Sequence, residues 1–232
     1  KGFLKKDCLD LLKKERNVFG ACMVSLKDAD AMICGLNRSY ALSLESIEYV
    51  LDPIPNKTIL GLTVMLCNGR TIFVADTNVH DMPNAQELAD ITHQSAEVVR
   101  EVFGIEPRAA LLSYSNFGKP FTERSAYIRD AIKILDNREV NFEYDGEMGA
   151  NVAVNENLLN LYPFCKLSGP ANLLIMPAIH SASISTKLLQ ELGGGNLVGP
   201  YLVGFNEPIQ IAPLGANVAD VVNLAALVAF KS

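Results

Sequence analysis

The sequence is poor in the features that would place it in or on a membrane. It contains no tryptophan, and its longest apolar stretches, such as 173–176 and 224–230, are short. A membrane-spanning helix needs about 20 consecutive apolar residues. No secretory signal peptide opens the sequence. We therefore expect a cytoplasmic protein with no membrane partner.

An excess of positive charge is also missing. The formal net charge is −6, from 26 acidic and 20 basic side chains. Nucleic-acid binding needs a clustered basic surface, so nucleic acid is not expected as a partner. The lysines at 5, 6, 13 and 14 lie at helical spacing beside apolar residues. This pattern is typical of one solvated helix face.

The cysteines do not form the patterns that bind zinc. The sequence has five cysteines and no CxxC pair, so we expect no structural metal site. The cysteines are scattered, odd in number and set among apolar residues. They are expected to be free thiols in a reducing compartment.

The sequence does contain a regular alternation of strand-like and helix-like segments. Strands separated by helices of ten or more residues predict parallel pairing through right-handed crossovers, and hence an α/β fold. Strands are expected at 31–36, 59–67, 71–75, 109–114, 140–144, 173–176 and 200–205. Helices are expected at 3–15, 18–26, 40–50, 123–135, 155–161, 181–192 and 217–230, with one more between Asn84 and Gly104.

Local signals mark several element ends. Asn68-Gly69 between two apolar runs predicts a hairpin. Asn84 with Glu87 three residues later predicts a capping box. Asp220 occupies the equivalent third position of the last helix, where an acid offsets the helix dipole and caps backbone N–H groups.

Polar loops follow the expected strands at their carboxyl ends, where open α/β sheets bind ligands. Arg38, in the loop 37–40, can hold a phosphate or carboxylate through its planar guanidinium. The alternative is a surface arginine near a helix N-terminus.

The loop 113–120 is a second candidate. It carries Ser113, Ser115, Asn116 and Gly118, and its backbone N–H groups can cradle an anion. Ordinary turn chemistry explains the same residues. It is not a Walker A loop, because the GxxxxGK[ST] spacing is absent.

Two acidic segments allow acid–base chemistry. The segment 76–81 contains two aspartates and His80, which invite a metal or acid–base interpretation; turn and capping duties are the alternative. The turn Asp145-Gly146-Glu147 offers paired carboxylates, or a structural hydrogen-bonding role. No nucleophile with a positioned base lies nearby in the sequence.

The segment 209–215 is expected to be a loop between an apolar strand and the last helix. α/β enzymes place polar chemistry at such a position. Here it offers Pro213 and Leu214, which neither donate a proton nor hold an anion.

Several of these segments together resemble the phosphate acetyltransferase/butyryltransferase family. They are Leu112-Ser113-Tyr114-Ser115, Asp145-Gly146-Glu147, Leu174-Ile175-Met176-Pro177 and the stretch from Gly199-Pro200 to Pro208. A second set more narrowly resembles the C-terminal region of the large bacterial NADP-dependent malic enzymes, in which a transacetylase-like domain follows the catalytic domain. These are 16–19, 28–31, 73–77, 168–172 and 180–185.

The resemblance implies two lobes with mostly parallel sheets and a cleft between them. One lobe would be 61–199. The other would be 1–60 plus 200–232, without about one hundred residues that the family places upstream. The parent enzyme would oxidatively decarboxylate malate to pyruvate, with NADP and a divalent metal, Mg or Mn, in a separate catalytic domain. No cofactor is expected in this chain.

The sequence departs from active acetyltransferases at the positions that bind phosphate in that family. The resemblance places a serine and an arginine at Pro213 and Leu214, and an arginine at Glu45. His180, Ser183 and Thr186 stand where the family has asparagines and a tyrosine. Each lost electrostatic donor typically costs ~10²–10³ in rate, so we expect no catalytic residue and no phosphotransacetylase activity.

The resemblance implies that acetyl-CoA acts through such a region as an allosteric inhibitor of the malic enzyme. The candidate contacts are Arg38, Tyr40, Ser113, Ser115, Asn116, Gly118 and Lys187. The malic enzyme domain and further copies of the chain are the expected protein partners. Two alternatives remain: an active phosphate acyltransferase, and a purely structural assembly module.

Overall fold

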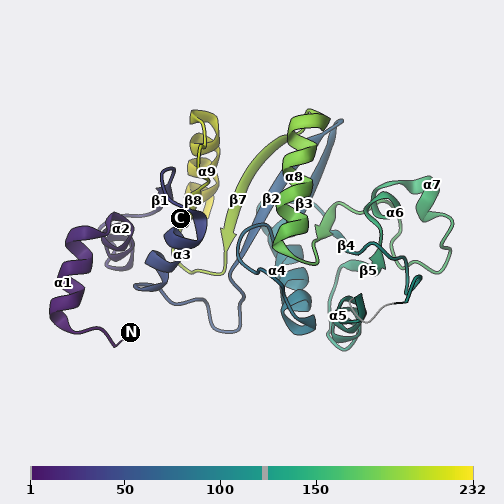
Figure 1. Cartoon of the computed structure of the whole chain (residues 1–232), viewed down its shortest axis with the longest axis horizontal. Coiled ribbons are helices and arrows are strands. Elements are labelled where there is room, and N and C mark those ends of the chain that lie inside the picture. Colours follow the sequence, from purple (N-terminus) through teal and green to yellow (C-terminus); the bar gives the residue numbers. More distant parts are fainter. Residues whose placement is uncertain (1, 122–124, 232) are drawn as a thin grey trace. The chain divides into compact units, whose positions relative to one another are not determined.

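The computed structural model describes residues 2–121 and 125–231, and the chain divides into two compact units. Unit 1 comprises Lys1–Gly61 and Val198–Ser232, and unit 2 comprises Leu62–Leu197. The strands are β1 (Met32–Gly35), β2 (Leu60–Cys67), β3 (Arg70–Ala75), β4 (Arg108–Leu112), β5 (Glu143–Met148), β6 (Leu173–Ile175), β7 (Asn196–Val203) and β8 (Ile209–Ala212). The helices are α1 (Lys5–Lys14), α2 (Arg16–Ser25), α3 (Tyr40–Glu48), α4 (Ala85–Phe103), α5 (Ala126–Asp136), α6 (Ala150–Val154), α7 (Glu156–Leu159), α8 (Ile179–Gly193) and α9 (Val218–Lys231) (Figure 1).

The main sheet has the strand order β5-β4-β6-β3-β2-β7. Strands β3, β6, β4 and β5 pair in parallel, and β2 pairs with β3 antiparallel. The predicted α/β class with mostly parallel pairing is therefore confirmed. The predicted hairpin is confirmed too: Asn68 and Gly69 have φ values of 50° and 71° between β2 and β3. Both are left-handed, as a two-residue turn of this twist requires.

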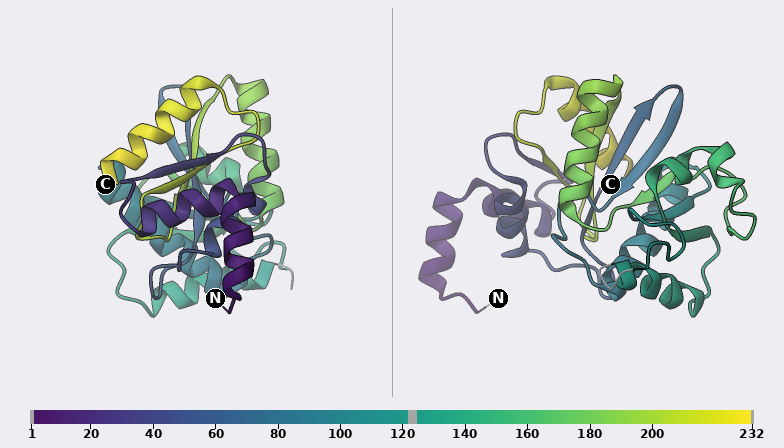
Figure 2. Two further views of the ribbon diagram at one scale, coloured as in Figure 1. Left: turned by 90° about the vertical axis from the view of Figure 1, so that its left-hand side faces the viewer. Right: turned by 45° about the vertical axis from the view of Figure 1, so that its right-hand side comes forward.

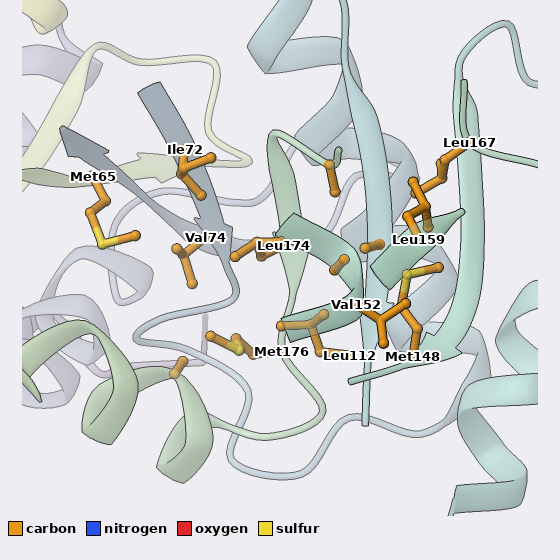
Figure 3. Packing of buried hydrophobic residues seen from close by; sticks show 14 residues of the cluster. Met65, Ile72, Val74, Leu112, Met148, Val152, Leu159, Leu167, Leu174 and Met176 are labelled. Carbon is orange, nitrogen blue, oxygen red and sulfur yellow. The ribbon is translucent and has the colours of Figure 1, made fainter. Parts of the chain in front are cut away.

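The sheet of unit 2 buries apolar side chains on both of its faces. Because neighbouring residues of a strand point to opposite sides, Val74 and Leu174 face one layer while Phe73 and Leu173 face the other. The first layer packs with Val152 of α6 and Leu159 of α7 (Figure 3). On the other side α4 contacts β3, β4 and β6, and the rings of Phe73 and Phe103 lie 4.9 Å apart.

Helix α4 begins and ends as its sequence predicts. Asn84 accepts hydrogen bonds from the backbone N–H groups of Gln86 and Glu87, and the Glu87 carboxylate accepts from the Asn84 N–H. Gly104 ends the helix in the left-handed conformation. The capping of α9 is also confirmed, because Asn217 and Asp220 exchange reciprocal bonds of 2.8 and 3.0 Å.

Unit 1 contains a two-stranded parallel sheet in which β1 pairs with β8, in register from Met32 with Ile209 to Gly35 with Ala212. Gly35 has φ +105°, and a Cβ there would meet the Ala212 carbonyl. Helices α2, α3 and α9 contact this sheet. Helices α1 and α2 meet at an angle at Glu15, which links them (Figure 2).

Three local predictions were wrong. Residues 209–212 form strand β8, so the expected loop begins only at Pro213. The strand expected at 140–144 lies at Glu143–Met148, which places Asp145-Gly146-Glu147 inside β5 and not in a turn. Helix α6 was not expected. In β5 the polar side chains are hydrogen-bonded within the protein. The strand therefore lacks the alternation of apolar and polar residues by which a strand is recognised in a sequence.

The helices of the described residues include none that is both long and apolar enough to cross a membrane.

The side chain of Gln210 in β8 forms hydrogen bonds with the backbone of β7. Its side chain is 2% exposed. Its amide oxygen accepts from the Leu202 backbone N–H at 2.7 Å, and its amide nitrogen donates to the Leu202 carbonyl at 3.1 Å. The side chain thus satisfies both backbone groups of one β7 residue.

Replacing this amide by an apolar side chain should destabilise the fold. Q210L leaves two buried backbone groups without these partners, and we expect a loss of about 3 kcal/mol in the free energy of unfolding, measured by urea denaturation. Q190L on the exposed side of α8 is the control and should change stability by less than about 0.5 kcal/mol. Equal stability of the two variants would contradict the role of Gln210.

Candidate functional site

Arg38 follows β1 in unit 1, just before Ser39 caps α3 by accepting a hydrogen bond from the Leu42 N–H. Its guanidinium donates to the Glu15 carboxylate at the junction of α1 and α2. This hydrogen bond lowers the pKa of Glu15 and raises that of Arg38. Arg38, the residue predicted to bind an anion, is therefore already engaged in an ion pair. Both side chains of the pair are partly exposed to solvent.

Two pockets in unit 1 share Arg38 as a wall. The larger has a volume of about 790 Å³ and is lined by Lys14, Arg16, Asn17, Gly20, Met32, Ile33, Cys34, Gly35, Leu36, Asn37, Arg38 and Val221. Three of these side chains are cationic and none is acidic, in a chain of net charge −6. Such a concentration of one sign favours an anionic ligand with apolar parts.

The smaller pocket, of about 320 Å³, is lined by Leu11, Glu15, Arg38, Leu42, Glu45, Ser46 and Tyr49. Its charge is the reverse of that of the larger pocket, because two carboxylates face one guanidinium. Glu45 accepts a 2.6 Å hydrogen bond from the Tyr49 hydroxyl, and this bond raises the pKa of Tyr49. The pocket does not favour a phosphate.

A turn follows β8 and leads to the cap of α9. Pro213 and Leu214 precede the α9 cap, and Leu214 is 70% exposed. Neither side chain carries a charge or a hydrogen-bond donor. A phosphate dianion at this turn would therefore receive no side-chain support from them.

The loop 113–118 lies in unit 2 and holds an internal carboxylate. The Ser115 hydroxyl donates to Glu147 at 2.7 Å, and the Gly118 N–H donates to the same carboxylate oxygen at 3.2 Å. The Ser113 hydroxyl lies 3.1 Å from that of Ser115. The amide oxygen of Asn116 accepts from the Gly149 N–H. These groups organise the loop in addition to any ligand role.

The predicted ligand residues fall in both units. Arg38 and Tyr40 belong to unit 1, whereas the loop residues and Lys187, exposed on α8, belong to unit 2. Their shared ligand role stays a prediction.

The sequence interpretation missed Arg129, the cation of the unit 2 cluster. Arg129 of α5 donates to Glu147 at 2.8 Å and to the Ser125 hydroxyl at 3.1 Å. The available signal was its position four residues after Ser125 on one helix face.

Asp76 and His80 form a pair after β3. Asp76 is 3% exposed and accepts hydrogen bonds from the N–H groups of Asn78, Val79 and His80 and from the His80 ring nitrogen Nδ1, at 2.7 to 3.2 Å. This geometry supports the capping interpretation of the segment. Asp145 also has a structural role, since it accepts from the N–H groups of Gly146 and Lys166.

The described residues supply no metal cluster, and burial keeps two of the thiols protonated. No group of three or more histidine, cysteine or acidic residues in the described ranges is arranged to hold a metal ion. Burial raises the pKa of Cys34 to about 12 and that of Cys165 to about 11. Both thiols are therefore protonated near neutral pH and poorly nucleophilic.

The fold agrees with a comparison to known proteins. The model of the "Phosphate acetyl/butaryl transferase" family matches residues 1–229, and the chain belongs to this family. A crystal structure of a phosphotransacetylase from Streptococcus pyogenes superposes with a TM-score of 0.85 at 29% identity, covering 93% of this chain and 67% of that one. The phosphate acetyltransferase of Treponema pallidum (strain Nichols) is 33% identical over 92% of this chain and 67% of its own length.

Malic enzymes are similar over a smaller part of their length. The NADP-dependent malic enzyme of Rhizobium meliloti (strain 1021) is 52% identical across all of this chain, which spans 30% of that enzyme. The NADP-dependent malic enzyme of Escherichia coli (strain K12) is 38% identical over 98% of this chain, again 30% of the enzyme. The chain thus corresponds to the phosphate-acetyltransferase-like region of such enzymes.

The Asp76–His80 pair makes stability depend on pH. The hydrogen bond to Asp76 is the main cause that raises the pKa of His80, against desolvation. A group whose folded pKa is raised stabilises the fold below its unfolded pKa, about 6.5, and this contribution is lost as pH rises through the folded pKa. D76N should therefore lower the pKa of His80 in an NMR titration and cost more stability at pH 5.5 than at pH 8.5.

E87Q is the control for this prediction, because Glu87 raises the His80 pKa least among the causes. An E87Q shift as large as that of D76N would be inconsistent with a hydrogen-bonded pair.

Proposed function

We propose that this chain is the regulatory and oligomerising region of an NADP-dependent malic enzyme, and that it does not itself transfer acetyl groups. The observation that carries the proposal is the chemistry of three side chains at the positions where the resemblance to active acetyltransferases places two arginines and a serine. Glu45, Pro213 and Leu214 provide a negative charge and two groups without donors, while the fold is kept. The 52% identity to a malic enzyme supports the parentage.

Acetyl-CoA is the proposed effector. Its phosphates carry several negative charges, and its pantetheine arm and acetyl group are less polar. The larger pocket of unit 1 offers Lys14, Arg16 and Arg38 beside apolar residues of β1, which suits both parts. A ligand regulates only by binding two conformations unequally. Arg38 can respond to an anion, because its present partner is the partly exposed Glu15.

A second copy of the chain is the proposed oligomeric partner. Helix α8 exposes Ile184, Leu188 and Leu192 at i, i+4 and i+8, with 60%, 53% and 82% of their surfaces accessible. This spacing places them on one helix face.

The malic enzyme catalytic domain, with its NADP and metal, is the proposed covalent partner. The free cysteines agree with a cytoplasmic location.

The purified full-length protein should form no acetyl phosphate from acetyl-CoA and phosphate above the uncatalysed background. Each missing donor typically lowers the rate of acetyl transfer by ~10²–10³, so the loss of three donors is expected to lower it by more than ~10⁶. A coupled assay measures this, with an active phosphate acetyltransferase as the positive control. Sustained turnover would establish the alternative function, an active phosphate acyltransferase.

R38A should weaken inhibition of malate oxidation by acetyl-CoA, because it removes one of three cations from the larger pocket. We expect an increase of about tenfold in the inhibitory concentration, the loss typical of one charge-assisted hydrogen bond. E15Q is the matched control: it breaks the same ion pair but keeps the guanidinium, so inhibition should persist or strengthen. Unchanged inhibition in R38A would remove this residue from the site. No heat of acetyl-CoA binding in calorimetry would favour a purely structural module.

A further inference from the structure

The most unusual polar group in the molecule is the carboxylate of Glu147, at the end of β5 in unit 2. Its side chain is 0% exposed. One oxygen, Oε1, accepts four hydrogen bonds, from Ser115 Oγ (2.7 Å), Arg129 Nη1 (2.8 Å), the Gly118 N–H (3.2 Å) and Ser125 Oγ (3.4 Å). The other oxygen, Oε2, is buried without a hydrogen-bond partner among the described residues.

These donors come from two separate places in the sequence. Ser115 and Gly118 belong to the loop after β4, whereas Ser125 and Arg129 belong to the start of α5. A guanidinium, two hydroxyls and a loop backbone N–H together form a typical anion site. Burying a carboxylate destabilises a fold unless the charge is paired and hydrogen-bonded. Here all the donors surround one of the two carboxylate oxygens.

We propose that the loop 113–118 and the first turn of α5 form a carboxylate-binding site whose resident ligand is the chain's own Glu147. The side chain acts as an internal blocking group. While it is in place, Ser115 and Gly118 donate to it and not to an external anion. The site therefore takes a small monocarboxylate only when the Glu147 carboxylate is removed. This inference does not rest on the acetyl-CoA function proposed above, although Ser115 and Gly118 are also among the predicted acyl-CoA contacts.

Further contacts of Glu147 and Arg129 act on the shape of the loop, in addition to the bonds that Ser115 and Gly118 donate to the carboxylate. The Phe117 N–H donates to the Glu147 carbonyl at 2.7 Å, and the Phe121 ring lies 4.5 Å from the Arg129 guanidinium carbon. Loss of the carboxylate should therefore loosen the loop as well as empty the site. A ligand that replaces the carboxylate should restore both the stability and the order of the loop.

The test is chemical rescue of E147A in the purified full-length protein. The truncation removes the carboxylate and one methylene, a space that formate fits and that propionate exceeds. We expect E147A to unfold at a lower temperature than the parent and to be cut faster by chymotrypsin after Phe117, which Gly118 follows. Sodium formate should raise its unfolding midpoint by about 3 °C or more beyond sodium chloride at equal ionic strength and slow the cleavage. Propionate should do neither.

Two variants separate binding from general salt effects. E147Q fills the site with a neutral side chain and should show no specific response to formate. E143A removes a more accessible carboxylate of the same strand, one that accepts from the Ser168 N–H and hydroxyl, and should respond to formate and chloride alike. Equal responses of E147A to formate, propionate and chloride would overturn the proposal.

If E147A does not fold, a double-mutant cycle tests the same site. R129M should destabilise the parent much more than it destabilises E147Q, because the guanidinium then has no carboxylate to hold. Equal losses in the two backgrounds would also overturn the proposal.

Discussion

The buried hydrogen bonds to Glu147 are the interaction on which the loop end of unit 2 depends. They join the loop after β4, strand β5 and helix α5 through one carboxylate oxygen. The strand can approach β4 closely because residue 146 is glycine; a Cβ there would lie 2.7 Å from the Leu111 carbonyl oxygen. Removing either partner of such a buried pair costs far more than an exposed ion pair, because the remaining charge stays buried. The loop geometry therefore follows from one acid and its arginine.

Elements with local signals could be predicted from the sequence, and elements defined by distant contacts could not. The Asn68-Gly69 turn and the Asn84–Glu87 capping box depend only on residues close in the sequence, and both predictions were confirmed. Strand β8 was missed because it has only four residues and is followed directly by Pro213. Its buried Gln210 is explained only by the Leu202 backbone. Likewise, the acids of β5 look like turn residues until their partners, at 115, 129 and 166, are known.

The candidate site shows the same division. The sequence pointed to Arg38, but its ion pair joins residues 23 positions apart and no local pattern encodes it. The absence of charge at Pro213 and Leu214 could be seen in the sequence, because it concerns residue type alone. The fold of the family is present in this chain, with a TM-score of 0.85 to a phosphotransacetylase. A scaffold of this kind can lose chemistry without losing shape, since its core residues and its reactive residues are different sets.

Arg38 lies on the boundary of two pockets of opposite character and is held by Glu15. An anion that engages this guanidinium has to compete with Glu15, and Glu15 is the residue that links α1 to α2. Helix α1 has no buried residue of its own, so it depends on contacts of this kind. Occupancy of one pocket and the attachment of the first helix are thus thermodynamically linked, and each must weaken or strengthen the other by the same factor.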